Sequence, residues 1–217
     1  MKKIDAKSYN KNKLEHFLSS KNVNFKGKWN AKNWCKNRDV LLIGPGKSTE
    51  KFKYDIQEII KSKKFLAVSI NINNSISEKF ISYYIASNEN RIMVDMHKYS
   101  KIKKPIIMPY KRVTNLVEKI NSKYIKDYGL KIDENKIIIN KNYCSLPNSL
   151  VFGYAISACV IGSAKNIYLV GFDGHETENS VQEEMLNLIK LFKSKIKKLN
   201  LTSLTPTTYP ISKSSIY

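Results

Sequence analysis

Residues 39–48 constrain the fold of this chain more than any other segment, because they read as a buried strand that ends in a glycine turn. Four apolar residues are followed by Gly-Pro-Gly and then by a helix-forming stretch. Glycine allows backbone angles closed to other residues and lets a ligand approach the main chain. A strand, a tight turn and a helix start together offer backbone N–H groups and a favourable dipole to an anion, often a phosphate. The predicted anion-binding residues are Gly44, Pro45, Gly46 and Ser48.

The turn differs from two common nucleotide-binding motifs. Its spacing and ending are not those of a Walker A loop, and the third glycine of the dinucleotide fingerprint is missing. Tight strand–helix turns without a ligand carry the same pattern. The turn therefore indicates a binding site only in combination with residues farther along the chain.

Strand and helix patterns alternate along the rest of the chain. Several apolar runs are continuous, which is typical of strands buried on both faces of a parallel sheet. The predicted strands are Val40–Ile43, Phe65–Ile70, Ile92–Val94, Ile106–Met108, Ile137–Ile139, Ile167–Val170 and Leu201–Leu204. The predicted helices are Lys51–Lys61, Val113–Asn121, Leu150–Ile161 and Val181–Leu199. This order predicts an α/β fold: a single doubly wound, mostly parallel sheet with helices on both faces, Rossmann-like, with ligands at the carboxyl ends of the strands.

The first 38 residues differ from the rest in being polar and rich in lysine and asparagine. We therefore predict an N-terminal arm over residues 1–38 and one Rossmann-like domain over residues 39–217. Three aromatic residues, Phe25, Trp29 and Trp34, are expected to anchor the arm to the domain.

The formal charge of +20 raises the question of a polyanionic partner. Nucleic acid is disfavoured, because specific nucleic-acid readers use arginine and only Arg38, Arg91 and Arg112 are present. An anionic substrate, or peripheral association with an anionic membrane, agrees better with scattered lysines. The chain has no apolar run long enough to span a bilayer, no signal-peptide pattern and an odd number of cysteines, three. We expect a cytoplasmic protein that can lie at the inner membrane.

His175 is the sharpest catalytic candidate. It lies in a glycine-flanked loop after a buried strand, between Asp173 and Glu176 and close to a predicted helix start. An imidazole placed in this way suits a general base that acts on a hydroxyl group. The alternative is a solvent-exposed loop histidine without a role.

Other polar residues lie just after the predicted strands. Asparagines can bind a ribose or phosphate without adding charge, and a carboxylate can pair with ribose hydroxyls or cap the next loop. The C-terminal hydroxyl groups are neutral donors suited to a departing phosphate. These candidates are Asn71, Asn73, His97, Asp173, Thr207, Tyr209 and Tyr217, and for His97 a structural role has an equal claim. No Asp-x-Asp pair, histidine cluster or Cys/His set is present, so no metal cofactor is expected.

Four segments together resemble bacterial sialyltransferases that act on lipooligosaccharide. They are Val40–Ser48, Asn148–Ala158, Asn166–Gly174 and Leu204–Thr207. A second resemblance is closer still and is carried by Lys165–His175, Ser203–Pro210 and Ser215–Tyr217. These segments are similar to a domain appended to aldolases of the hydroxymethylglutaryl-lyase type in surface-polysaccharide gene clusters. The resemblance covers residues 39–217.

This resemblance implies metal-independent transfer of a sialic-acid-like sugar from a CMP-activated donor to a surface-glycan acceptor. The turn at 44–48 would hold the nucleotide phosphate region, and Asn71 would contact the ribose or phosphate. Ser149 would lie near the cytidine phosphate, and Asp173 would close the Gly-x-Asp motif. His175 would be the catalytic base, and Tyr209 and Tyr217 would stabilise the departing phosphate. Because the similar domain is fused to aldolases, the resemblance also agrees with an aldolase-type partner or a homo-oligomer.

The chain departs from the family at two points. Almost nothing separates Asp173 from His175, where the family has a long lid, and the family's second asparagine is replaced by Met96-His97. Two alternatives therefore stay open. One is an ATP- and magnesium-dependent pyrophosphokinase of the hydroxymethylpterin type, and the other is a non-catalytic nucleotide-binding or assembly module.

Overall fold

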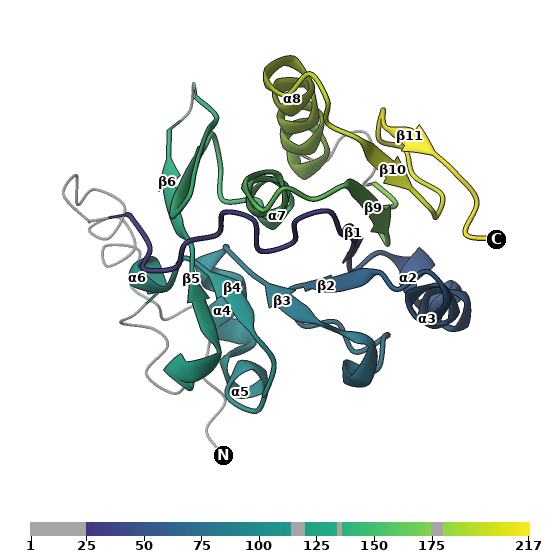
Figure 1. Cartoon of the computed structure of the whole chain (residues 1–217), viewed down its shortest axis with the longest axis horizontal. Coiled ribbons are helices and arrows are strands. Elements are labelled where there is room, and N and C mark those ends of the chain that lie inside the picture. The colour runs from purple at the N-terminus through teal and green to yellow at the C-terminus, as the bar shows by residue number, and fades with distance from the viewer. Residues whose placement is uncertain (1–24, 114–119, 134–135, 175–179) are drawn as a thin grey trace.

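The computed structural model describes residues 25–113, 120–133, 136–174 and 180–217. Its centre is an eight-stranded sheet in the order β11-β10-β9-β1-β2-β3-β4-β5, in which every pair of neighbours is parallel (Figure 1). The strands are β1 (Asp39–Ile43), β2 (Leu66–Ile70), β3 (Tyr83–Ile85), β4 (Ile106–Met108), β5 (Ile125–Asp127), β9 (Asn166–Val170), β10 (Leu201–Ser203) and β11 (Ser212–Lys213). The predicted doubly wound α/β sheet is confirmed.

Helices cover both faces of this sheet because alternate residues of each strand point to opposite sides. In β1, Leu42 packs with the apolar residues of α7 (Val151–Ile161) and α8 (Ser180–Lys195). Its neighbour Leu41 packs on the other face with α3 (Lys53–Ser62), α4 (Glu89–Val94) and α5 (Met96–Tyr99). Two further short helices are α2 (Lys47–Lys51) and α6 (Tyr110–Val113), and the 3-10 turns are η2 (Glu78–Phe80) and η4 (Ser122–Tyr124). No helix in the described ranges has the length and apolar character needed to cross a bilayer.

A second, three-stranded sheet comes after β5 in the chain and was not predicted. Its order is β6-β8-β7, with β6 (Gly129–Ile132) parallel and β7 (Ile138–Asn140) antiparallel to β8 (Tyr143–Leu146). Only Ile137–Ile139 was expected to be a strand here. In the chain this small sheet comes before α7, and the strand after α7 is β9, which pairs with β1 in the large sheet.

The described part of the predicted arm packs against the domain through its aromatic residues. Phe25 and Tyr143 have ring centroids 5.0 Å apart. The indole Nε1 of Trp34 donates to the carbonyl of Ala158 at 2.7 Å, and Trp29 lies edge-on to Trp34. The expected anchoring by these three aromatic residues is confirmed.

The prediction of a strand at Ile92–Val94 is wrong, since these residues form the end of α4. The Asn88 side chain accepts a hydrogen bond from the Arg91 backbone N–H at 3.0 Å and so caps this helix. The strand at this place in the sheet is instead β3, whose sequence Tyr-Tyr-Ile is less apolar than the equally short Ile-Ile-Met of β4. His97, predicted to follow a strand, therefore lies in α5. Of the predicted helix Val113–Asn121, residues 114–119 lie outside the described ranges.

Candidate functional site

The order in which the chain adds strands to the sheet reverses beside β1. From β1 the chain runs through α3 on one face to β2, whereas β9, the other neighbour of β1, leads through α8 on the opposite face to β10. Loops that leave neighbouring strands toward opposite faces open a crevice at their carboxyl ends, where doubly wound proteins bind ligands. The predicted turn after β1 lies at this point.

The turn after β1 is locked to the loop after β9. The Gly44 N–H donates to the Val170 carbonyl at 2.8 Å, and the Gly46 N–H donates to the Gly171 carbonyl at 2.9 Å. A Cβ built on Gly44 would lie 2.5 Å from the Gly171 carbonyl oxygen, so the close approach requires glycine. The Thr49 hydroxyl donates to the Gly44 carbonyl at 2.7 Å and closes the turn.

Asp173 takes the position that the sequence assigns to a phosphate. Its Oδ2 accepts a hydrogen bond from the Ser48 backbone N–H at 2.9 Å, and its Oδ1 accepts one from the Ser48 hydroxyl. The Ser48 and Thr205 hydroxyl oxygens are 3.1 Å apart, and Thr205 Oγ1 also accepts from the Gly171 N–H at 3.1 Å. The start of α2 is therefore satisfied by a carboxylate of the protein, and a phosphate there would meet a negative charge.

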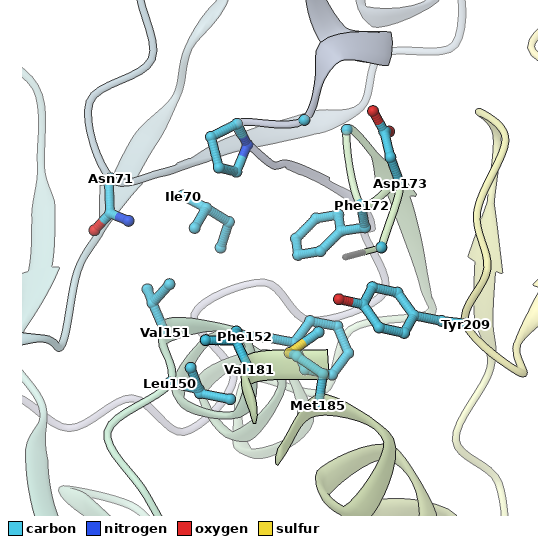
Figure 2. Close-up of a pocket in the computed structure, with 14 residues that line it drawn as sticks. Ile70, Asn71, Leu150, Val151, Phe152, Phe172, Asp173, Val181, Met185 and Tyr209 are labelled. Atoms are coloured by element: carbon cyan, nitrogen blue, oxygen red, sulfur yellow. The ribbon is translucent and has the colours of Figure 1, made fainter. Parts of the chain in front are cut away.

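A pocket of about 250 Å³ opens next to this turn. Figure 2 shows Phe172 and Tyr209 entering it on the side of Asp173, Asn71 on the opposite side, and α7 residues below. Its apolar wall comes from Pro45, Ile70, Leu150, Val151, Phe152, Phe172, Val181 and Met185. Its polar lining comes from Asn71, Asp173, Tyr209 and the glycine backbone at 46, 171 and 174. An apolar slot with a few convergent polar groups is the usual form of a small-molecule site.

The two predicted asparagines have different roles. Asn71 has a φ of 56° and lines the pocket, and in the described structure its buried Oδ1 has no hydrogen-bond partner. Its amide nitrogen faces the pocket in Figure 2. Asn73 uses both ends of its amide inside the protein: Nδ2 donates to the Gly44 carbonyl at 2.9 Å, and Oδ1 accepts from the Ser75 N–H at 2.9 Å. Asn71 is thus available to a ligand, and Asn73 supports the turn.

The start of α7 forms the floor of the pocket. Its capping residue, Leu150, offers no side-chain hydrogen bond, and the first turn holds no acidic residue. The first backbone N–H groups of a helix have no partner within it, so they point a partial positive charge at the pocket. Ser149 precedes this helix; its carbonyl accepts from the Ser87 hydroxyl at 2.9 Å, and its Oγ lies 3.4 Å from Asn88 Nδ2.

Of two predicted residues near the C-terminus, Tyr209 lines the pocket and Thr207 supports it from behind. Thr207 Oγ1 donates to the Phe172 carbonyl at 2.5 Å and accepts from the Tyr209 N–H at 3.1 Å, which positions Tyr209. Tyr209 is only 3% exposed, and Figure 2 shows its hydroxyl directed into the pocket. Burial, and secondarily the charge of Asp173, raises the pKa of Tyr209 above its ordinary value of 10.0. The hydroxyl is therefore a protonated donor at neutral pH.

Two predicted residues in the described ranges, His97 and Tyr217, lie away from the pocket. His97 is exposed on α5, and the Ser100 hydroxyl donates to its backbone carbonyl. Tyr217 is 83% exposed, and its hydroxyl lies 3.3 Å from Asp55 Oδ2; the charge of Asp55 raises the pKa of Tyr217. His175 lies outside the described residues, so its role as a base stays a prediction.

Sequence reasoning missed most of the apolar wall and the bridging residue Thr205. The wall residues are ordinary apolar positions of strands and helices, and nothing in their spacing separates a pocket wall from a core. Thr205 was noted only as part of the Leu204–Thr207 segment, although it links Ser48 to Gly171. Within the described ranges, no three His, Cys, Asp or Glu side chains gather to hold a metal ion.

Comparisons of the chain with protein-family models, with curated proteins and with solved structures find no match.

Proposed function

We propose that this protein transfers a sugar from a CMP-activated donor to a hydroxyl of a glycan acceptor, with the nucleotide in the pocket beside β1 and β9. The observation that carries the proposal is the position of this pocket, with polar groups at both of its ends, at the point where the strand order of the parallel sheet reverses. The sialic-acid-like nature of the donor rests on the sequence resemblance alone.

The start of α7 and Tyr209 are the groups suited to the donor phosphate. In the transfer, the acceptor oxygen forms a bond to the anomeric carbon, and the bond from that carbon to the phosphate oxygen breaks. The electron pair leaves on CMP, so negative charge grows on the phosphate. Donors already fixed in place stabilise such charge at little reorganisation cost. The α7 dipole is worth about 1 kcal/mol toward an anion, and the Tyr209 hydroxyl adds a neutral donor.

The proton of the acceptor hydroxyl needs a base. His175 comes directly after Gly174, which lines the pocket, in the chain. We assign this role to His175 from the sequence. The net charge of +20 supports an anionic donor and acceptor, because it raises the local concentration of anions.

Replacing Tyr209 with phenylalanine tests the assignment of the phosphate donor. The Tyr209 hydroxyl has no hydrogen-bond partner among the described residues, so folding stability should change by less than about 0.5 kcal/mol. Loss of one donor to a charged group should weaken CMP binding about tenfold. Calorimetric titration measures the affinity, and Tyr54→Phe, on the exposed side of α3, is the control. Unchanged affinity in Tyr209→Phe would remove Tyr209 from the site.

Turnover separates the proposed transferase from the two alternatives. We expect the unmodified protein to release CMP from a CMP-sugar in the presence of a chelator. The variant His175→Ala should lose this turnover and retain its affinity for CMP. A strict requirement for ATP and magnesium would favour the pyrophosphokinase. Nucleotide binding without turnover of either donor would favour a non-catalytic module.

A further inference from the structure

A second pocket, of about 470 Å³, is lined in part by residues of β5. Figure 1 shows β5 at the opposite edge of the sheet from β11. Three separate segments build it: residues 28–29 before β1, residues 110–111 after β4, and residues 122–127 in and before β5. Three strand spacings separate β5 from β2, about 14 Å. This pocket is therefore distinct from the one beside β1 and reaches the same, carboxyl, edge of the sheet.

Asp127 joins the three segments through hydrogen bonds to backbone N–H groups. Its Oδ2 accepts from the Lys28 backbone N–H and its Oδ1 from the Tyr110 backbone N–H, both at 3.0 Å. Its own carbonyl accepts from the Trp29 N–H at 2.9 Å, and the residue is only 7% exposed. Among the described residues Asp127 forms no ion pair with a lysine, so it shapes the pocket through its backbone hydrogen bonds and keeps its negative charge.

The formal charge of the described lining is positive, because three lysines outnumber the one carboxylate of Asp127. Lys28, Lys111 and Lys126 line it, and in the part of the chain that the structure describes none of their ammonium groups forms an ion pair or a hydrogen bond. Three like charges within one pocket repel one another, and an anionic ligand relieves that repulsion. No arginine is among the described residues that line the pocket, and the planar guanidinium of arginine is the preferred reader of phosphate and nucleic acid.

Trp29 gives the pocket a flat apolar surface next to these charges. Its ring is held edge-on by Trp34 and Tyr128, with centroids 6.0 and 6.5 Å away, and it remains partly exposed. A rigid indole can cover the apolar C–H face of a sugar ring and has little conformational entropy to lose. Lysines around such a ring suit the carboxylates of the sugar.

We propose that this second pocket binds an acidic saccharide, with Trp29 against a sugar ring and Lys28, Lys111 and Lys126 around its carboxylates. That this saccharide is the acceptor of the transfer rests on the proposed function. The binding itself does not, because the pocket is separate from the nucleotide pocket.

The test is a fluorescence titration with a hyaluronan hexasaccharide, which carries regular carboxylates, and with neutral maltohexaose as its comparator. Only two tryptophans are present, and of these Trp29 lines the pocket, so an emission change that is lost in Trp29→Phe reports on the pocket. We expect saturable emission change with the hyaluronan probe, weakened by salt, and none with maltohexaose. Trp29→Phe should abolish the signal while circular dichroism stays unchanged. Equal binding of maltohexaose would overturn the proposal.

Paired variants separate the pocket from the general charge of the protein. The double variant Lys111→Gln/Lys126→Gln should bind the hyaluronan probe at least tenfold more weakly than the unmodified protein. Lys190→Gln/Lys195→Gln removes the same charge from exposed positions of α8 and should bind within twofold of it. Equal losses of affinity for the hyaluronan probe in both double variants would overturn the proposal. So would an oligo-dT hexanucleotide that binds more tightly than the hyaluronan probe and whose binding Lys111→Gln/Lys126→Gln abolishes. If the hyaluronan probe binds while CMP does not, the saccharide site stands and the proposed transfer fails.

Discussion

Gly171→Ala is expected to destabilise the protein by roughly 3–5 kcal/mol, the sum of backbone strain and a steric clash. Gly171 has a φ of 72°, in the left-handed region that glycine favours. A Cβ at this position would lie 1.9 Å from Thr49 Oγ1 and 2.5 Å from the Gly44 carbonyl oxygen. These atoms belong to the locked turn and cannot move without breaking its hydrogen bonds.

Chemical denaturation followed by circular dichroism measures this effect. Gly153→Ala is the matched control, because its new Cβ would meet only the end of the flexible Leu188 side chain, at 2.7 Å. Alanine also favours the helix over glycine by up to about 1 kcal/mol, so the control should stay within about 1 kcal/mol of the unmodified protein. An unchanged denaturation midpoint in Gly171→Ala would contradict the close approach of the loops after β1 and β9.

Asp173→Ala is expected to cost roughly 2–3 kcal/mol of stability and at least tenfold in CMP affinity. The carboxylate binds both the N–H and the hydroxyl of Ser48, and a part-buried N–H without an acceptor is costly. The affinity for CMP should fall because the turn that forms one wall of the pocket loses its hydrogen bonds to Asp173. Asp173→Asn keeps the shape and one acceptor oxygen and should show an intermediate stability loss.

CMP affinity in Asp173→Ala also locates the phosphate. If the phosphate binds at the start of α7, the substitution weakens binding. If CMP binds more tightly to Asp173→Ala, the phosphate binds instead at the Ser48 N–H, where the carboxylate competes with it, and our assignment to α7 is wrong. Asp133→Ala is the control for the charge change, since its ion pair with Lys131 lies partly exposed beside the second sheet and is worth about 0–1 kcal/mol.

The sheet could be predicted from the sequence because its strands are buried on both faces. The runs at β1, β2 and β9 contain five residues each, most of them apolar, and helices with a 3.6-residue period come after β1 and β9. The short strands β3, β5 and β11 contain two or three residues and form through pairing with neighbours distant in the chain. These strands lack the wholly apolar run that marks the equally short β4, and Ile92–Val94 was predicted in place of β3 for that reason.

The candidate site was predictable where the chain itself forms a turn and not where distant side chains meet. Gly44 and Gly46 stand out because a tight turn after a strand needs them. Asp173 was identified as a polar strand end, yet its partner Ser48 lies 125 positions earlier in the chain, and only the parallel pairing of β1 with β9 brings them together. Tyr217 was grouped with Tyr209 by sequence proximity, but the chain after β11 carries it to α3.

Calorimetric titration with CMP, without added metal and with UMP, GMP and ATP–magnesium as comparators, tests the proposed function most directly. We expect selective CMP binding at one site with a dissociation constant below about 1 mM, weakened by both Tyr209→Phe and Asp173→Ala. Absence of binding to any of the four nucleotides, or a preference for ATP–magnesium, would contradict a CMP-sugar transferase.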